Sequence, residues 1–261
     1  MGKTEITVEA REHVLLIGLN RSAKMNAMNR AMYHGIAAAY GLLDRDPDLR
    51  VGLVHAAGQH FTAGLELDDW VDVFAGGSGI ELDEGEIDPF GIASDSLSKP
   101  LVFATQGICF TCGVELMLNA DIRIAASNVR YAQLEVQRGI FPCGGATFRL
   151  PEEIGWANAQ RYLLTGDEWS GAQALEWGLI QDLVEPEALF DQAWLLARKV
   201  AQAAPLGVQG SLRSSRLARL QGHKAASEAL FPALVPVMQS EDAEEGVRSF
   251  LQRRKAEFKG R

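Results

Sequence analysis

The chain has 261 residues, of which 47% are hydrophobic and 23% are charged, with a formal net charge of -9. A chain of this length buries a sizeable core and suits one large domain, or one domain with a short appendage. The composition is ordinary for a globular protein, which argues against a disordered chain and against a fibre. The acidic charge argues against nucleic acid as the main partner, because binding to a phosphate backbone needs a cationic face.

The beginning of the chain and the cysteine count bear on the compartment. No apolar run reaches the roughly 18 residues of a membrane span. The first residues include Glu5, Glu9, Arg11 and Glu12, where a secretion signal would have an apolar stretch. Three cysteines make an odd count, which favours reduced thiols over a disulfide framework. We therefore expect a cytoplasmic protein with no membrane partner.

A hairpin and a helix are predicted at the start of the chain. Residues 5–19 alternate between polar and apolar and then run apolar, which fits two strands that turn at Arg11 and Glu12. Residues 29–43 have apolar and small residues at spacings of three and four. This periodicity predicts a helix, and Asn29 is suited to be its N-cap.

Two short apolar runs, residues 51–58 and 101–107, resemble each other. Each ends in glycine and has the composition of a buried strand. In both copies another glycine follows six residues later, at Gly64 and at Gly113, before a segment that can start a helix. The pattern is a weak internal repeat of strand, tight loop and helix.

Residues 72–98 lie between the two copies and hold several glycines and a run of acidic residues. This composition is typical of a mobile loop, either a lid or a disordered insert. Phe74, Ile87 and Phe90 are interspersed among the acids and leave the choice between the two open.

Helices are predicted for most of the rest of the chain. Ser170 is suited to be an N-cap, and Gly178 is suited to end the helix that begins there. Residues 187–203 and 222–258 also have helical patterns. The tail is therefore expected to be a helical appendage on an α/β core, packed against a neighbouring subunit.

The helix start around Gly113 is a candidate anion site. Thr111 and Cys112 precede the apolar run 114–118, so N–H groups at the helix start would face the ends of the strands. The first repeat copy, residues 62–65, could present a second N–H group to the same place. Two donors from two loops would form an oxyanion hole, which stabilises negative charge on a carbonyl oxygen.

Two acidic residues stand out near these loops. Glu115 interrupts an apolar run in the first turn of the helix, an expensive place for an acid that is neither paired nor used. A carboxylate that caps the helix or interacts with its dipole is an equally good interpretation. For Glu135, an exposed acid at the end of a strand is the simpler interpretation. The residues alone therefore leave both roles open.

Short motifs spread over nearly the whole chain point to one known family. They are LNR (residues 19–21), NAM (26–28), the loop 61–67, residues 107–115 and 120–122, Glu135, the turn 139–142 with Gly144 and Gly145, LTG (164–166), WGL (177–179) and the end 250–259. Each is weak alone, but together they resemble the crotonase superfamily, the enoyl-CoA hydratases and isomerases. The resemblance implies an α/β fold, a crotonase-like spiral of ββα repeats over residues 1–195. A C-terminal helical trimerisation region would follow over residues 196–261.

The resemblance also implies a reaction. The backbone N–H groups of Leu65 and Cys112 would hold the thioester oxygen of an acyl-coenzyme A and stabilise an enolate. Glu115 and Glu135 match the two acids of the family's hydratases. Glu115 would deprotonate water for attack at the β carbon, and Glu135 would deliver a proton to the α carbon. The expected enzyme is a 2-enoyl-CoA hydratase, a hydro-lyase of fatty acid β-oxidation, with coenzyme A present only as part of the substrate and no other cofactor.

For coenzyme A, the resemblance points to residues from two subunits. Backbone groups of Ala63 and Leu67 would lie near the adenine, and Lys24 would lie near the phosphates. Phe250 and Arg253 would reach the same ligand from the adjacent subunit of a homotrimer or of a dimer of trimers. A solvated helix face is an equally good explanation for Arg253.

The cysteines depart from the family pattern and keep alternatives open. Cys112 lies in the oxyanion loop, and Cys143 lies where hydratases commonly have glycine and dienoyl-CoA isomerases have an acid. Cys109 and Cys112 form a Cys-x-x-Cys pair, but zinc needs about four ligands and no histidine is near in sequence, so we expect no metal. An enoyl-CoA isomerase or another crotonase-type enzyme is one alternative. A non-catalytic relative that binds acyl-CoA or RNA is the other.

Overall fold

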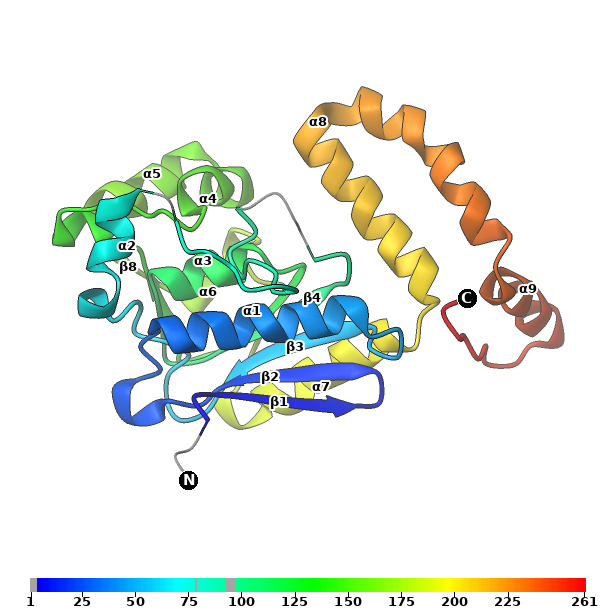
Figure 1. Ribbon diagram of the computed structural model, residues 1–261, viewed down its shortest axis with the longest axis horizontal. Coiled ribbons are helices and arrows are strands. Elements are labelled where there is room, and N and C mark those ends of the chain that lie inside the picture. The colour runs from blue at the N-terminus through cyan, green and yellow to red at the C-terminus, as the bar shows by residue number, and fades with distance from the viewer. Residues whose placement is uncertain (1–3, 78, 93–96) are drawn as a thin grey trace.

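The computed structural model describes residues 4–77, 79–92 and 97–261. These residues form a layered α/β core, from which two long helical arms extend near the C-terminus (Figure 1). Within the described ranges, every helix is too short or too polar to span a lipid bilayer.

The predicted hairpin is formed by β1 (Ile6–Arg11) and β2 (Val14–Leu19), which pair antiparallel. Glu12 and His13 make the turn between them, and both have positive φ angles, 46° and 68°. Two such residues give the tight turn whose twist suits a hairpin. Every residue of β2 is buried, whereas β1 lies at the edge of the sheet and is mostly exposed.

The main sheet has six strands in the order β1-β2-β3-β4-β6-β9. From β2 onward, all neighbouring strands pair in parallel. The further strands are β3 (Val51–Ala56), β4 (Leu101–Thr105), β6 (Ile122–Ala126) and β9 (Asp182–Val184). The prediction of buried strands after residues 51 and 101 is therefore confirmed.

A smaller sheet of three strands carries part of the candidate site. In its order, β5-β7-β8, the first pair is parallel and the second is antiparallel. Its strands are β5 (Ile108–Phe110), β7 (Arg130–Ala132) and β8 (Glu168–Ser170). Because β5 ends just before Thr111, this sheet fixes the start of the following helix.

Helices cover both faces of the main sheet. Alternate residues of β2 face opposite sides, since Leu15 and Ile17 join the core cluster under α1 (Arg30–Arg45), while Val14 and Leu16 join the cluster under α7 (Leu189–Ala201). This alternation is the two-residue period of a strand that is buried on both faces. Asn29 accepts a hydrogen bond from the Met32 N–H, which confirms the predicted N-cap.

The remaining core helices surround the smaller sheet. The prediction for Ser170 and Gly178 is confirmed, because Ser170 forms a capping box with Gln173 and Gly178 has a φ of 76°. These helices are α2 (Val71–Gly76), α3 (Cys112–Leu118), α4 (Ala146–Ile154), α5 (Trp156–Thr165) and α6 (Gly171–Glu176), with short 3-10 turns at Ser22–Lys24, Leu67–Asp69, Glu135–Arg138 and Pro186–Ala188.

About half of the described residues in the acid-rich segment 72–98 are buried or half-buried. It contains the end of α2, and beyond it Asp88 and Phe90 are buried. The Tyr33 hydroxyl of α1 donates to Asp88 at 3.0 Å. Residues 78 and 93–96 lie outside the described residues, so the predicted mobility of the whole segment stays a prediction.

The C-terminal region consists of α8 (Pro205–Met238) and α9 (Glu241–Gln252). The single helix predicted over residues 222–258 is wrong in extent, because it is interrupted at residues 239–240 and because helix also covers residues 205–221. Gly222 has non-helical angles, φ 86° and ψ 166°, and the chain reverses there, so that α8 forms two arms that run side by side (Figure 1). The boundary predicted after residue 195 falls within α7, which packs on the sheet along its length.

Candidate active site

The loop after β3 runs beside Met28 and leaves the Leu65 N–H free. The Met28 N–H donates to the Gly64 carbonyl at 2.8 Å, and the Glu66 N–H donates to the Met28 carbonyl at 2.9 Å. In such a parallel bridge the groups that flank Leu65 face Met28, so the N–H of Leu65 itself points the other way. Among the described residues, it has no acceptor.

The second loop joins β5 to α3 and leaves the Cys112 N–H free. Cys112 is the first residue of α3, where N–H groups lack a partner within the helix, and no other acceptor occurs in the described part of the chain. Thr111 before it has a φ of 49° and a ψ of -115°. A β-branched residue rarely adopts this conformation, which costs about 1 to 3 kcal/mol.

The two loops touch at two places, where a glycine of one faces a threonine of the other. A Cβ atom on Gly64 would lie 2.2 Å from Oγ1 of Thr111, and a Cβ atom on Gly113 would lie 2.4 Å from Cγ2 of Thr62. Only glycine allows this close approach. The two predicted N–H donors, Leu65 and Cys112, therefore lie on adjoining loops.

The sequence repeat that places these two loops together is closer than its glycine spacing alone indicated. Residues 61–67 read FTAGLEL and residues 110–116 read FTCGVEL, which are identical at five of seven positions. The copies differ in which N–H is free: Ala63 donates to a carbonyl at 3.0 Å, whereas its counterpart Cys112 does not. Conversely, the Val114 N–H donates to the Thr111 carbonyl at 2.9 Å, whereas the N–H of its counterpart Leu65 has no acceptor among the described residues. Each copy thus supplies one donor.

Glu115 lies in the first turn of α3 with an exposed fraction of 3%. Its Oε1 accepts hydrogen bonds from the Gly144 N–H at 2.7 Å and from the Ala146 N–H at 3.2 Å. Burial raises the pKa of Glu115 to about 7, and these two N–H groups and the Arg149 charge oppose the rise. The carboxylate therefore binds a distant turn, which rules out the interpretation as a cap of its own helix.

Glu135 begins the 3-10 turn after β7 and is 8% exposed, so its interpretation as an exposed acid is wrong. Burial raises its pKa to about 8, and the charge of Glu115 adds to the rise. The Gln133 amide, oriented with its nitrogen toward Glu135, donates to both carboxylate oxygens at 2.9 Å. The two predicted acids are therefore buried together and interact electrostatically.

The cysteines are protonated thiols at neutral pH. Burial raises the pKa of Cys109 and of Cys112 well above the usual value, and it raises the pKa of Cys143 to about 11. The charges of Glu115 and Glu135 raise the pKa of both Cys112 and Cys143 further. Since the thiolate is the reactive form, none of the three is an activated nucleophile.

Part of the segment 72–98 covers Glu115. The ring of Phe90 reaches within 2.9 Å of where a Cβ atom on Gly144 would lie, next to the Glu115 carboxylate. Arg149 of α4 donates to the Phe90 carbonyl at 2.6 Å and to the Gly91 carbonyl at 2.7 Å. Arg149 is not among the residues predicted from the sequence, since no local pattern marks it.

The turn at residues 88–91, which carries Phe90, has a recognisable sequence pattern. Asp88 accepts from the Phe90 N–H at 2.9 Å and from the Ile92 N–H at 2.9 Å. Asp, Pro, Phe and Gly at residues 88–91 are the residue types of a turn that an aspartate side chain starts and a glycine ends. The covering loop is therefore a defined turn.

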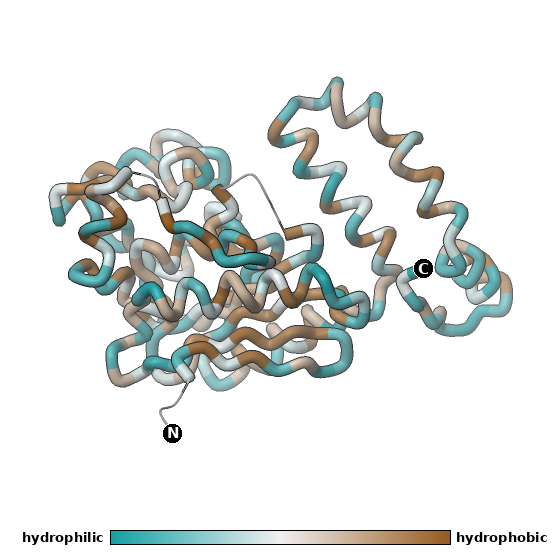
Figure 2. The backbone as a smooth tube through the Cα atoms, in the orientation of Figure 1, coloured by the Kyte–Doolittle hydropathy of each residue, from teal (hydrophilic) through white to brown (hydrophobic). Residues whose placement is uncertain are grey.

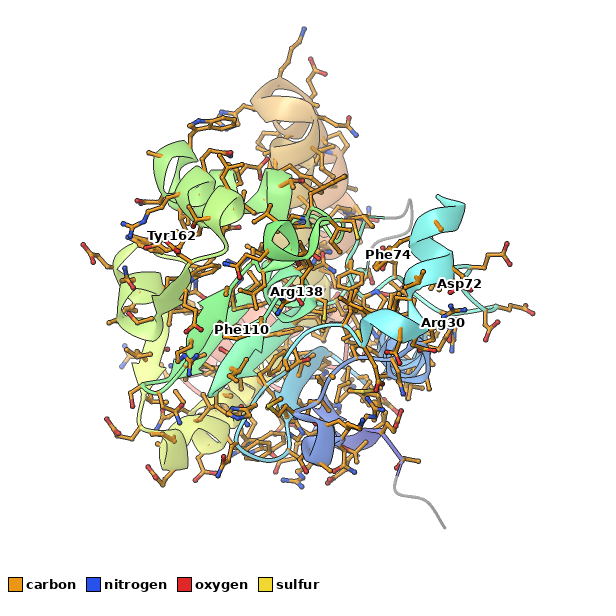
Figure 3. All side chains as sticks on the ribbon, turned by 90° about the vertical axis from the view of Figure 1, so that its left-hand side faces the viewer. Arg30, Asp72, Phe74, Phe110, Arg138 and Tyr162 are labelled. Carbon is orange, nitrogen blue, oxygen red and sulfur yellow. The ribbon has the colours of Figure 1, made fainter. Side chains whose placement is uncertain are left out.

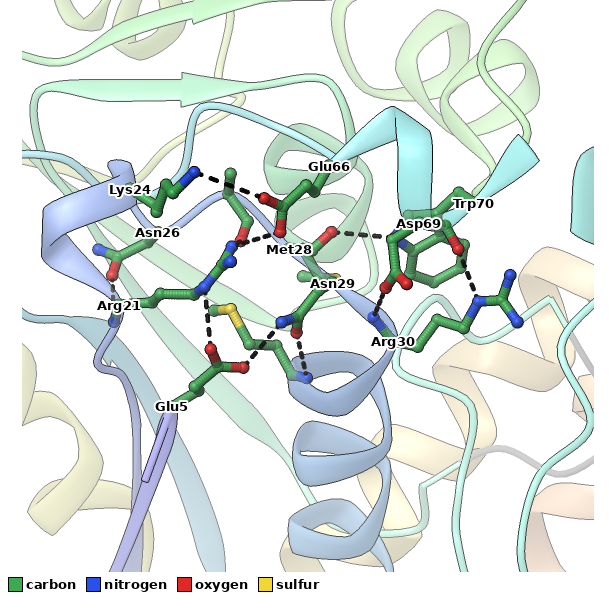
Figure 4. Close-up of polar contacts among 12 residues, drawn as sticks. Glu5, Arg21, Lys24, Asn26, Met28, Asn29, Arg30, Glu66, Asp69 and Trp70 are labelled. Atoms are coloured by element: carbon green, nitrogen blue, oxygen red, sulfur yellow. Dashed lines mark hydrogen bonds and ion pairs between the residues drawn. The ribbon is translucent and has the colours of Figure 1, made fainter. Parts of the chain in front are cut away.

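Of the predicted coenzyme A residues, Lys24, Ala63 and Leu67 lie around the first loop. The Ala63 N–H donates to the Met25 carbonyl at 3.0 Å, which places it beside the turn that carries Lys24. Lys24 Nζ lies 3.9 Å from a carboxylate oxygen of Glu66, and its side chain is largely exposed (Figure 4). The three residues therefore share one edge of the core.

Ion pairs hold this edge in place. Arg21 lies 2.7 Å from Glu66 and 2.9 Å from Glu5, so Glu66 already has a strong partner (Figure 4). Arg30 pairs with Asp72 and ties α2 to the start of α1 (Figure 3). The loop that carries Leu65 is thus anchored on both sides.

Phe250 and Arg253 lie elsewhere. α9, which ends next to Arg253, and the 3-10 turn at Ser22–Lys24 are at opposite ends of the molecule in Figure 1. Phe250 is 81% exposed, and within the described ranges the Arg253 side chain has no hydrogen bond or ion pair. Arg254, by contrast, donates to Glu245 at 2.5 Å and 2.8 Å. One chain therefore does not bring Phe250 and Arg253 to Lys24.

Comparison with known proteins gives a consistent result. Residues 9–261 match the protein family described as enoyl-CoA hydratase/isomerase. An enoyl-CoA hydratase of Mycobacterium tuberculosis is 32% identical over 258 residues, which cover 97% of this chain and 96% of that protein. A 2,3-dehydroadipyl-CoA hydratase of Escherichia coli is 30% identical, with 99% of this chain and 100% of that protein covered.

Solved structures show the same likeness. The crystal structure of a probable enoyl-CoA hydratase/isomerase from Mycobacterium abscessus is 43% identical and superposes with a TM-score of 0.95, covering 98% of this chain and 99% of that chain. The likeness includes the C-terminal region, because nearly the whole of both chains is covered. The fold predicted from the sequence motifs is therefore confirmed.

Proposed function

The chain belongs to the enoyl-CoA hydratase/isomerase family, and from this premise we propose that it adds water across the 2,3 double bond of a 2-enoyl-CoA thioester. The observation that carries the proposal is the buried pair Glu115 and Glu135. The free N–H groups of Leu65 and Cys112 on the adjoining loops support it. Coenzyme A enters the reaction as the thioester part of the substrate.

The two N–H groups would act on the thioester oxygen. When water adds to the β carbon, the electron pair of the double bond moves toward the thioester, and negative charge develops on that oxygen. Donors held by the backbone of two anchored loops need no rearrangement to stabilise the charge. Removal of one such donor typically lowers kcat about 10²- to 10³-fold.

The groups around each acid assign the role of base to Glu115 and the role of acid to Glu135. The two N–H bonds from Gly144 and Ala146 favour ionised Glu115 and hold its pKa near 7, so Glu115 takes the proton of the attacking water. Burial and the charge of Glu115 raise the pKa of Glu135 to about 8, although the Gln133 amide donates to its oxygens and favours the ionised form. We therefore assign the proton that is given to the α carbon to Glu135. In enzymes that use one carboxyl group as acid and another as base, the environments of the two groups commonly move their pKa values apart.

The proton balance closes over one turnover. Glu115 gains the proton that water loses as its oxygen bonds to the β carbon, and Glu135 loses the proton that bonds to the α carbon. One proton must then pass from Glu115 to Glu135, directly or through solvent, before the next turnover. The electrostatic interaction between the two carboxyl groups is consistent with such a return.

Two substrates test the proposal. The purified protein is mixed with crotonyl-CoA or with a 3-enoyl-CoA, and the absorbance of the conjugated thioester is followed. Hydration removes the absorbance with crotonyl-CoA. A rise of absorbance with the 3-enoyl-CoA alone would identify an isomerase instead, and no change with either substrate would contradict the proposed function.

We further propose that the protein assembles into a homotrimer or a dimer of trimers, in which Phe250 and Arg253 complete the coenzyme A site of a neighbour. The arms of α8 leave a groove of about 720 Å³ between them, and hydrophobic residues follow both arms (Figure 2). Leu220 and Phe231 of α8 are about four-fifths exposed. Exposed apolar surface of this kind is typical of a subunit interface, and light scattering in solution measures the mass.

A further inference from the structure

We propose that Thr111 is a positioning residue of the oxyanion hole: its side chain is the spacer that sets the separation between the loops of Leu65 and Cys112. The inference rests on the proposed function, because it concerns the two N–H groups that would hold the thioester oxygen. Thr111 directly precedes Cys112, and the glycine that it touches, Gly64, directly precedes Leu65.

The backbone of Thr111 is held from two sides. Its N–H donates to the Ala132 carbonyl of β7 at 2.8 Å. Its carbonyl accepts from the N–H groups of Val114 and Glu115 in α3, at 2.9 Å and 3.2 Å. The position of the Thr111 side chain is therefore fixed relative to both the smaller sheet and α3.

The Thr111 side chain occupies the place where a side chain on Gly64 would begin. A Cβ atom on Gly64 would lie 2.2 Å from Oγ1 of Thr111, 3.4 Å from its Cβ and 3.5 Å from its Cγ2. The first loop thus rests on the Thr111 side chain at the residue before Leu65. A smaller side chain at position 111 would let the Leu65 N–H move toward α3.

Neither the backbone nor a hydrogen bond explains a threonine at this position. With a φ of 49° and a ψ of -115°, glycine would suit the backbone better. The Thr111 hydroxyl is buried and forms no hydrogen bond of regular geometry among the described residues, although it interacts with the Cys112 thiol and opposes the rise of that thiol's pKa. Its counterpart Thr62 donates to the Asn26 carbonyl at 2.7 Å and accepts from Gly64 at 3.1 Å. What Thr111 contributes is the volume of its side chain.

Two substitutions separate volume from hydroxyl chemistry. Thr111→Gly removes the spacer and relieves the backbone, so we expect an unchanged or higher Tm together with a kcat that falls about 10- to 100-fold, as expected when reacting groups are displaced by about 1 Å. Thr111→Val keeps the branched shape without the hydroxyl and should retain most of the activity. Thr62→Gly is the control for glycine itself and should lower the Tm, because it loses both hydrogen bonds.

A spectroscopic readout reports on the two donors directly. Butyryl-CoA labelled with ¹³C at the thioester carbonyl has no double bond to hydrate, and hydrogen bonds lower its carbonyl stretching frequency. In the Thr111→Gly variant this frequency should move toward its value in free solution, while the affinity for coenzyme A alone stays unchanged. In Thr111→Val it should match the unmodified protein.

Three results would overturn the inference: normal kcat and carbonyl frequency in Thr111→Gly, a strongly lowered Tm in Thr111→Gly, or equal loss of activity in Thr111→Val. The last would assign the role to the hydroxyl. If the unmodified protein hydrated no enoyl-CoA, the proposed function would fail. The carbonyl frequencies and Tm values would still decide the role of Thr111.

Discussion

At the scale of single residues, the candidate site is two carboxyl groups whose environments differ. Glu115 has two backbone N–H donors and a nearby arginine charge, whereas Glu135 has the Gln133 amide as a donor and the carboxylate of Glu115 as a neighbour. Burial raises both pKa values, the hydrogen bonds of Glu115 oppose the rise of its pKa, and the charge of Glu115 adds to the rise for Glu135. The difference follows from partners distant in sequence, since Gly144 lies 29 residues after Glu115.

Replacement of either acid by its amide tests the assignment. Glu115→Gln and Glu135→Gln keep the shape of the side chain and remove its proton transfer, which is typically worth about 10² to 10⁴ in rate. We expect kcat with crotonyl-CoA to fall by that factor in each variant, while the Kd for coenzyme A stays the same. Glu152→Gln is the control, because Glu152 is exposed on α4 and pairs with Arg219. Near-normal hydration by either acid variant would refute its role.

The pH dependence follows from the same two groups. The proposed base, Glu115, must be ionised, so kcat/KM should rise with pH through about 7. The proposed acid, Glu135, must be protonated, so kcat/KM should fall again above about 8. Because the groups interact, the two apparent pKa values belong to the pair. The measurement is kcat/KM for crotonyl-CoA across the range in which the protein stays folded, and a profile that is flat between pH 6 and pH 9 would contradict it.

At the scale of elements, we expect the turn at residues 88–91 to limit the access of water to the Glu115 carboxylate. Burial is the main cause of the raised pKa of Glu115. The Phe90 ring covers the Gly144 turn beside Glu115, and Arg149 donates a hydrogen bond to the Phe90 carbonyl. Phe90→Ala should admit water and lower the pKa of Glu115, so the acidic limb of the kcat/KM profile should move to lower pH. Phe148→Ala, at a half-exposed neighbour of Arg149, is the control. An unmoved limb in Phe90→Ala would show that Phe90 does not keep water from Glu115.

Elements that depend on neighbours in the chain could be predicted from the sequence. Local patterns identified the Asn29 cap, the strands after residues 51 and 101, and the suspicious burial of Glu115, because each depends on neighbours in the chain. The hydrogen bond from Arg149 to the Phe90 carbonyl joins residues that are 59 positions apart in the sequence, and no local pattern marks it. Such partners are chosen by packing, which a single sequence does not display.

The error in the C-terminal helices has a different origin. Apolar spacing continues beyond Met238, so periodicity alone predicted one helix over residues 222–258. Ser240 interrupts this helix, because its backbone is extended and it starts α9 by accepting a hydrogen bond from the Ala243 N–H. The helical arm before Gly222, residues 205–221, was not predicted. The Ser240 cap was visible in the sequence, whereas the reversal at Gly222 depends on the arms packing side by side.

At the scale of the whole molecule, the two ends of the proposed coenzyme A site lie too far apart within one chain. Arg253 has a free side chain at the end of α9, and Arg254 is bound to the buried Glu245. In the proposed trimer, Arg253→Ala should raise KM for crotonyl-CoA with little change of Tm. Arg254→Ala should instead lower the Tm, because it leaves the Glu245 carboxylate with fewer partners.

Mixing two impaired subunits tests whether the site is shared. A Glu115→Gln subunit supplies an intact Arg253, and an Arg253→Ala subunit supplies an intact Glu115. If each site uses residues of two neighbours, random co-assembly of equal amounts restores about a quarter of the sites. Co-expressed subunits with different affinity tags should then show more activity at low substrate concentration than the two homogeneous variants averaged. If the mixed assembly shows only that average, Arg253 acts within its own subunit or not at all, because the regained activity can arise only across an interface.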